Sequence, residues 1–212
     1  MKTQLLILAI TLWSFTSFGQ EDAYSNTMLS TMESMDNASS KEDYLRCASQ
    51  FERIATAEKS KWLPYYYGAN SLIIMSFDET DGSEKDLILD RAQLMLDQAF
   101  ELAPEESELF ALQAFLYPSR ILVDPMGRGM LYMEKMFKSL ATAKALNPDN
   151  PRIYFLEGVN MLNMPPAMGG GPEVAKPILE EADTKFKAFK NEDPLWPKWG
   201  EEANLAELKK VQ

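Results

Sequence analysis

One spaced pattern of small and large residues recurs along this chain and restricts what it can fold into. Its three copies are Ala92-Leu96-Ala99-Pro104, Met136-Leu140-Ala143-Pro148 and Ala175-Leu179-Ala182. Steps of four and then three residues place the members of each copy on one helical face, where Ala lets a neighbouring helix approach closely. Pro stops the helix about one turn later. The pattern predicts an all-α fold, a right-handed solenoid of helix pairs.

A second repeat supports the same register. Phe110 and Tyr154 are 44 positions apart, and so are Ala114 and Gly158. The expected helices cover about 24–35, 40–59, 65–77, 84–103, 107–117, 130–146, 151–163 and 172–189, with a capping helix in the tail 194–212. The segment 118–129 is too apolar for a solvated loop. We expect it to pack on the body, with residues 121–123 extending the preceding helix as a bent turn.

These residues resemble the tetratricopeptide repeat (TPR), a helix–turn–helix unit of about 34 residues. The matching positions are Gly68, Ala92, Leu96, Ala99 and Pro104 in one unit, Phe110, Ala114, Met136, Leu140, Ala143 and Pro148 in the next, and Tyr154, Gly158, Ala175, Leu179 and Ala182 in the last. The resemblance covers about residues 41–189. Because the steps between Ala99, Ala143 and Ala182 are 44 and 39 residues, it implies insertions between the two helices of a pair.

A shorter motif, Met168-Gly169-Gly170-Gly171 followed by Ala175, is similar to secreted TPR-like proteins of Gram-negative bacteria. That group includes the helical subunit associated with some periplasmic solute transporters. The glycines themselves are typical of a tight turn between helices, where side chains would clash.

The first residues indicate export. Lys2 precedes an apolar run from Leu5 to Trp13, and Ser17-Phe18-Gly19 places small residues at the −3 and −1 positions of a cleavage site. This is the pattern of a secretory signal peptide over residues 1–19. The residue directly after the cleavage point is Gln20, not the cysteine that carries the lipid in a bacterial lipoprotein. The mature protein would be one domain, residues 20–212, with a periplasmic or secreted location and no integral membrane segment after cleavage.

Charge and composition exclude several functions. Without Lys2 the chain has 20 basic and 32 acidic residues, an excess that repels nucleic acid and anionic lipid. The chain has no histidine and one cysteine, Cys47, which excludes histidine-based nucleophilic catalysis and histidine-ligated zinc. We therefore predict a non-enzymatic protein without a cofactor or metal site, with Cys47 as a buried apolar thiol.

The methionines allow two interpretations. They are Met126, Met130, Met133, Met136, Met161, Met164 and Met168. Thioether sulfur suits monovalent copper, but the same spacing follows helix faces and loop plugs, and Met commonly fills irregular gaps in a core. We favour packing.

The first helices of the pairs are expected to line a concave groove. Its stripe of candidate contacts consists of Tyr65, Leu72, Phe115, Arg152, Phe155 and Asn163. Aromatic surfaces with a few polar groups are typical of peptide grooves, and Arg recognises carboxylates. The chain is thus predicted to be an exported scaffold for a protein or peptide partner. The alternative for this face is that the insertion linkers and the Trp-rich tail fold over it and make it core.

A second functional hypothesis is a periplasmic carrier of a small organic anion, or an accessory subunit of a transporter. Its pocket would lie between the stripe and the segment 120–128. The candidate anion contacts are Arg120, Arg128, Gly170 and Gly171.

Overall fold

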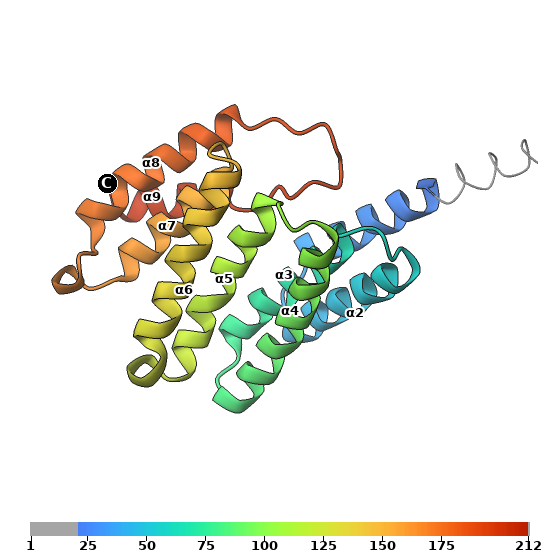
Figure 1. The fold of residues 1–212 in the computed structure, drawn as a ribbon, viewed down its shortest axis with the longest axis horizontal. Helices are drawn as coiled ribbons and strands as arrows, with labels where there is room; N and C mark the ends of the chain where they lie inside the picture. The colour runs from blue at the N-terminus through green and yellow to red at the C-terminus, as the bar shows by residue number, and fades with distance from the viewer. Residues whose placement is uncertain (1–20, 212) are drawn as a thin grey trace, which may run out of the picture.

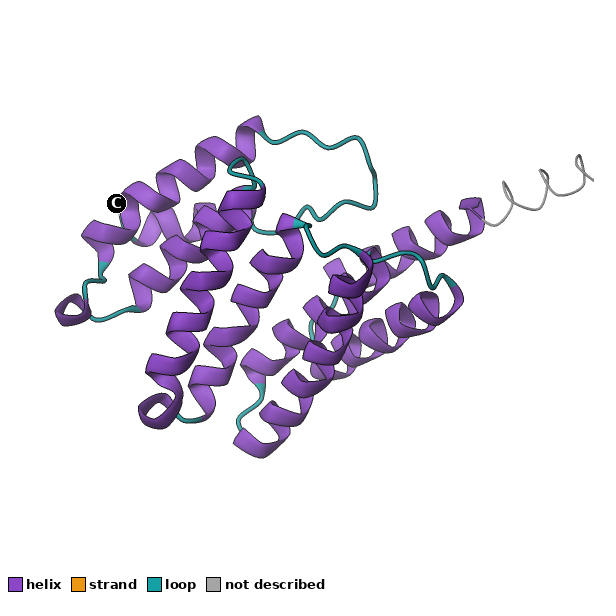
Figure 2. Ribbon diagram, in the orientation of Figure 1, coloured by secondary structure: helices purple, strands orange, loops and turns teal. Residues whose placement is uncertain are grey.

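The computed structural model describes residues 21–211, and the predicted signal peptide lies outside that range. The described residues form helices and loops without a strand (Figure 2). The predicted all-α fold class is confirmed. No helix in this part of the chain is both long and apolar enough to cross a membrane.

The helices follow one another as a solenoid-like stack (Figure 1). Residues 21–36 are helical and precede α2. The remaining elements are α2 (Lys41–Ala57), α3 (Leu63–Asp78), α4 (Gly82–Leu102), α5 (Ser107–Val123), α6 (Pro125–Leu146), α7 (Pro151–Asn163), the 3-10 turn η1 (Pro166–Met168), α8 (Pro172–Ala188) and α9 (Glu201–Lys210). The helices α3, α5 and α7 are the first members of their pairs, and α3 contacts α5 as α5 contacts α7.

Local sequence signals fix where these helices begin. The Ser40 hydroxyl accepts from the Asp43 backbone N–H while the Asp43 carboxylate accepts from the Ser40 N–H, which is a capping box at the start of α2. Asp81 caps α4. Asn150 caps α7, and Pro151 stands at its first turn, where a missing N–H costs nothing.

The junction between α5 and α6 differs from the prediction. The predicted extension of the preceding helix is present, because α5 continues through Pro118 to Val123. The following helix, however, begins at Pro125 rather than near residue 130, so Asp124 joins the two helices and its carboxylate accepts from the Gly127 N–H at 3.0 Å. The predicted insertion is wrong for this pair, since the extra length lies in the helices themselves. The loop 164–171 does separate α7 from α8.

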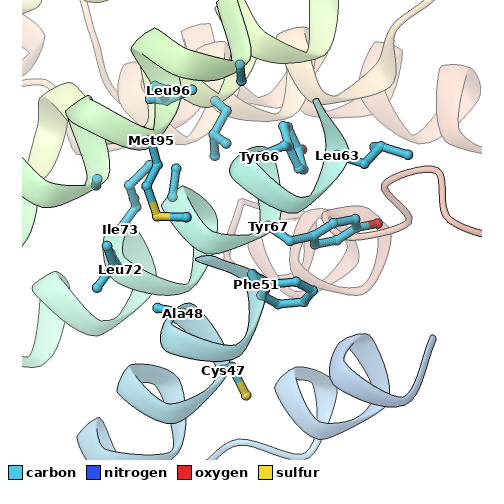
Figure 3. Packing of buried hydrophobic residues seen from close by; sticks show 14 of the residues in the cluster. Cys47, Ala48, Phe51, Leu63, Tyr66, Tyr67, Leu72, Ile73, Met95 and Leu96 are labelled. Carbon is cyan, nitrogen blue, oxygen red and sulfur yellow. The ribbon is translucent and has the colours of Figure 1, made fainter. Parts of the chain in front are cut away.

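Small residues of the repeated pattern lie at the closest helix contacts. The side chains of Ala92, Ala99, Ala143, Ala175 and Ala182 are completely buried. Gly68 and Gly158 leave no room for a side chain, because a Cβ there would overlap Met95 and Leu179 respectively. Figure 3 shows the core around Phe51, Tyr67, Leu72 and Met95. Cys47 is 3% exposed, and burial raises the pKa of its thiol, as expected for an apolar cysteine.

We predict that Gly158→Ala destabilises the fold by about 1–3 kcal/mol. The added Cβ would lie 2.5 Å from Cδ2 and 2.7 Å from Cγ of Leu179, so α7 and α8 would have to separate. Gly129→Ala is the matched control, because no atom lies within 4 Å of its added Cβ. Since alanine favours a helix interior, the control should be stabilised by roughly 0.5–1 kcal/mol. Urea unfolding measures both changes, and equal stability of the two variants would contradict the prediction.

Candidate ligand-binding site

The predicted stripe lies on α3, α5 and α7, but its members differ in accessibility. Leu72 and Arg152 are each 1% exposed and so are parts of the core. Phe155 is 8% exposed, Tyr65 and Phe115 are half-buried, and Asn163 is exposed. One cavity is lined by Phe115, Phe155 and Asn163. The α3 residues Tyr65 and Leu72 are instead packed in the hydrophobic core cluster.

A C-terminal segment, residues 189–200, crosses the face formed by these three helices, and we call it the strap. The Tyr67 hydroxyl donates to the Leu195 carbonyl at 2.9 Å, and the indole N–H of Trp199 donates to the Tyr66 hydroxyl at 2.7 Å. The Trp199 ring stacks on Phe115 with 5.5 Å between ring centroids and 25° between planes. The strap therefore covers the centre of the expected groove with the protein's own chain.

Arg152, on α7, connects the strap to α5. Its Nε and Nη2 atoms donate to the two carboxylate oxygens of Glu108, at 2.6 and 2.7 Å. Its Nη1 donates to the Trp199 carbonyl at 3.2 Å. Burial lowers the pKa of a guanidinium, but Glu108 outweighs this effect and raises the pKa of Arg152. Arg152 thus joins α5, α7 and the strap, and because it is buried it presents no surface to a partner's carboxylate.

An apolar pocket of about 610 Å³ lies beside the strap, between the ends of α3, α5, α6 and α7 and the loop after α7. Phe77 and Phe115 stack at its base, with ring centroids 5.4 Å apart. Its lining consists of Phe77, Phe115, Pro118, Ile121, Leu122, Gly129, Met133, Met136, Phe155, Leu156, Val159, Asn160, Asn163, Met164, Pro165 and Met168. The volume is in the range of sites for small organic ligands.

The pocket lining is chemically simple. Asn160 and Asn163 are its polar side chains, and each donates an amide N–H to the backbone of its own helix, at 2.7 and 2.8 Å. The lining has no charged residue and no hydroxyl, thiol or imidazole. Such a surface can bury a flat apolar body, but it offers no nucleophile or general acid.

The mouth of the pocket is also apolar. Leu122 and Met168 line the pocket and are 54% and 52% exposed, so the pocket reaches the surface between α5 and the 164–171 loop. Met126 and Met130 follow on the first turns of α6, with 96% and 76% exposure. Large exposed apolar side chains gathered at one place usually mark a binding site.

The four candidate anion contacts are engaged in internal contacts. Arg120 pairs with Asp86 and Asp90, and Arg128 pairs with Asp86 at 2.8 Å. The Gly170 N–H donates to the Pro165 carbonyl at 3.3 Å and the Gly171 N–H to the Met161 carbonyl at 2.8 Å. None of the four lines the apolar pocket. The pocket is lined by Phe115 of the stripe and by Ile121 and Leu122 of the segment 120–128, the two parts of the chain between which the small-molecule hypothesis places its ligand.

The methionines divide between core and pocket. The pocket is lined by Met133, Met136, Met164 and Met168. Of these, Met136 also belongs to the core, because it is 1% exposed. Among residues 21–211, no group of three His, Cys, Asp or Glu residues is placed to hold a metal ion.

Comparison with known proteins finds similarity among solved structures. No protein-family model and no curated protein matches the chain. Among solved structures, the chain is similar to the HusA haemophore from Porphyromonas gingivalis, with 32% sequence identity and a TM-score of 0.81 over 89% of this chain and 92% of that one. The chain belongs to the family of that haemophore.

In this member of the haemophore family, part of the pocket comes from residues that were not predicted from the sequence. The residues that α6 contributes to the pocket, Gly129, Met133 and Met136, belong to a second helix of a pair, whereas the predicted groove stripe was limited to the first helices. The available signal in the sequence was the group of methionines around Gly129, at positions 126, 130 and 133. A chain with that many thioethers near one junction can leave an adaptable apolar surface there.

We predict that Glu108→Gln costs about 3–5 kcal/mol of folding stability, because it leaves the buried Arg152 guanidinium without a counter-charge. The carboxylate and guanidinium side chains are 2% and 1% exposed. Glu207→Gln is the control, since its pair with Lys210 is on the surface and is worth at most about 1 kcal/mol. Thermal unfolding distinguishes the two, and a small loss in both variants would show that the buried pair does not hold the fold.

Proposed function

We propose that this protein is a carrier that captures haem in the apolar pocket, without enzymatic activity of its own. The observation that carries the proposal is the pocket itself, which is formed on the same fold as a 32% identical haemophore. Haem is a flat ring with large apolar faces and two carboxylates on one edge. Its ring suits the aromatic and thioether walls, while its carboxylates would remain at the open mouth in water, because no cation lines the pocket.

The proposed ligand is thus recognised by its apolar body. Although haem is an organic anion, as the carrier hypothesis requires, Arg120, Arg128, Gly170 and Gly171 are not its expected contacts. A protein or peptide partner in the groove has less support, because the strap fills the groove's centre through Trp199. The apolar residues at the mouth leave room for such a partner beside the pocket.

The remaining parts of the proposal rest on the sequence. Cleavage after residue 19 would export the protein to the periplasm or beyond, where a haem carrier can meet its ligand. We also propose that the helix pairs are TPR-like repeats. The buried Ala residues and the two glycines at helix contacts support this relation, since the TPR pattern reserves small residues for those positions.

The direct test introduces a bulky side chain into the pocket. Gly129 lines the pocket, and a Cβ there meets nothing within 4 Å, so Gly129→Trp should fill the space without disturbing the helix. We expect haem affinity to fall at least about tenfold, which corresponds to 1.4 kcal/mol. Absorbance titration of the mature protein with haem measures this.

The matched control is Leu94→Trp, which places the same ring on α4 at a position that is 67% exposed. It should leave haem affinity unchanged, and both variants should unfold at the wild-type temperature or above. Equal affinity of the wild type and Gly129→Trp would place the haem site elsewhere.

A further prediction concerns the iron. The iron-binding donors in the pocket lining are thioethers, and apolar burial should supply most of the affinity. Metal-free protoporphyrin IX should therefore bind within about tenfold of haem. Fluorescence titration with the metal-free ring measures its affinity. If the metal-free ring binds more than about a hundredfold more weakly, axial ligation dominates instead, and Met→Leu substitutions in the lining would identify the ligand.

A further inference from the structure

A second cavity, of about 660 Å³, is lined by Trp199, whose ring stacks on Phe115 of the apolar pocket. It is formed by the end of the helix 21–36, by α2 and α3, and by the chain from Lys198 into α9. Its lining is mixed in character, with aromatic, amide and charged side chains. The proposed haem function makes no use of it.

Asn70 is the feature of this cavity that internal packing leaves unexplained. Its side chain lines the cavity and is 2% exposed. Its Oδ1 atom is buried and accepts no hydrogen bond from the described residues. An acceptor left in this state costs about 1–3 kcal/mol, which an apolar residue of the same shape would avoid. A ligand that donates an N–H to Oδ1 would remove that cost.

The charges around the cavity favour a cation. Three carboxylates, those of Asp36, Glu201 and Glu202, face one ammonium group, that of Lys198. Burial raises the pKa of Asp36, and Lys198 opposes this shift, so the Asp36 carboxylate lacks full compensation by protein groups. Glu201 and Glu202 also suit the positive end of α9, but that role does not account for Asn70.

Aromatic rings provide the remaining walls. Tyr44, Tyr67 and Trp199 all line the cavity. Tyr67 and Trp199 are held in place, because the Tyr67 hydroxyl donates to Leu195 and the Trp199 indole donates to Tyr66. Ring faces attract cations, and the attraction increases when water is excluded.

We propose that this cavity is a second binding site, for a small organic cation that bears an ammonium group on an aromatic body. The ammonium group donates to Asn70 Oδ1, the surrounding carboxylates balance its charge, and the aromatic walls stack on its body. The site is independent of haem binding. Trp199 lines this cavity and stacks on Phe115, which lines the apolar pocket.

Tryptamine and indole-3-acetate form a suitable pair of probes, because they carry the same ring with opposite charges. Calorimetric titration of the mature wild-type protein should show tryptamine binding at least about tenfold more tightly than indole-3-acetate. Equal affinities would show that the ring alone is recognised and would overturn the proposal. An affinity for tryptamine weaker than about 1 mM would overturn it as well.

Two variants test the assigned contacts. Asn70→Leu removes the unpartnered acceptor, so it should keep or increase thermal stability while tryptamine affinity falls at least about tenfold. Glu201→Gln/Glu202→Gln should weaken tryptamine by a similar factor, and it changes only exposed side chains, so it keeps the test valid if Asn70→Leu fails to fold. Unchanged tryptamine affinity in a folded variant would overturn the proposal.

The control for charge is Glu180→Gln/Glu181→Gln, two exposed acidic residues on α8 outside the cavity. It removes the same net charge and should leave tryptamine binding unchanged. Equal weakening by both double variants would indicate a general charge effect and contradict the assigned site. Haem titration of the Asn70→Leu and Glu201→Gln/Glu202→Gln variants should match the wild type, which separates failure of this site from failure of the proposed function.

Discussion

The buried ion pair between Arg152 and Glu108 is the interaction on which the rest of the structure depends. It joins equivalent positions of α5 and α7, 44 residues apart, and its third contact holds the Trp199 carbonyl. Two charges removed from water cost several kcal/mol each, which the bidentate geometry offsets only while both partners remain. The pair therefore acts less as a source of stability than as a constraint, since the same guanidinium that pairs with Glu108 also donates to the Trp199 carbonyl of the strap.

On either hand of the strap's contacts the structure has two cavities of different chemistry. With Trp199 fixed against Phe115 and Tyr66, the side toward α6 and α7 holds thioethers, aliphatic side chains and phenylalanines. The side toward α2 holds tyrosines, an amide and carboxylates. A single open groove would expose a long apolar face to water, and the strap reduces it to the mouth around Leu122 and Met168.

The helices could be predicted from sequence because each signal for them is local. Ala92, Leu96 and Ala99 reveal a helical face by spacing, and Ser40 or Asn150 reveals a helix start by its residue type. The position of Arg152 could not be predicted in this way, because an arginine on a groove-facing helix has the same local pattern whether it meets a ligand or Glu108. Burial there is decided by residues 195–199, whose path depends on contacts with α3. The α5–α6 junction was predicted incorrectly for a related reason. Pro118 and Pro125 have the local pattern of loop residues, and it is the packing of the surrounding helices that decides their conformation.

A pocket that binds by apolar burial has consequences for a carrier. In the proposed haem complex, the contact energy of a porphyrin on Phe115, Phe155 and the methionines would be spread over many weak interactions and would lack the direction of an imidazole–iron bond. Unbranched Met133, Met164 and Met168 adjust to the shape of a ring at small cost, so a pocket of this kind would accept related tetrapyrroles. Release would then require no breakage of a strong axial bond, and a receptor that covers the exposed rim at Leu122, Met126 and Met130 could compete for the same apolar surface. In the proposed function, weak axial ligation and an exposed rim would thus be two aspects of one solution, in which a carrier holds its ligand firmly enough to protect it and still passes it on.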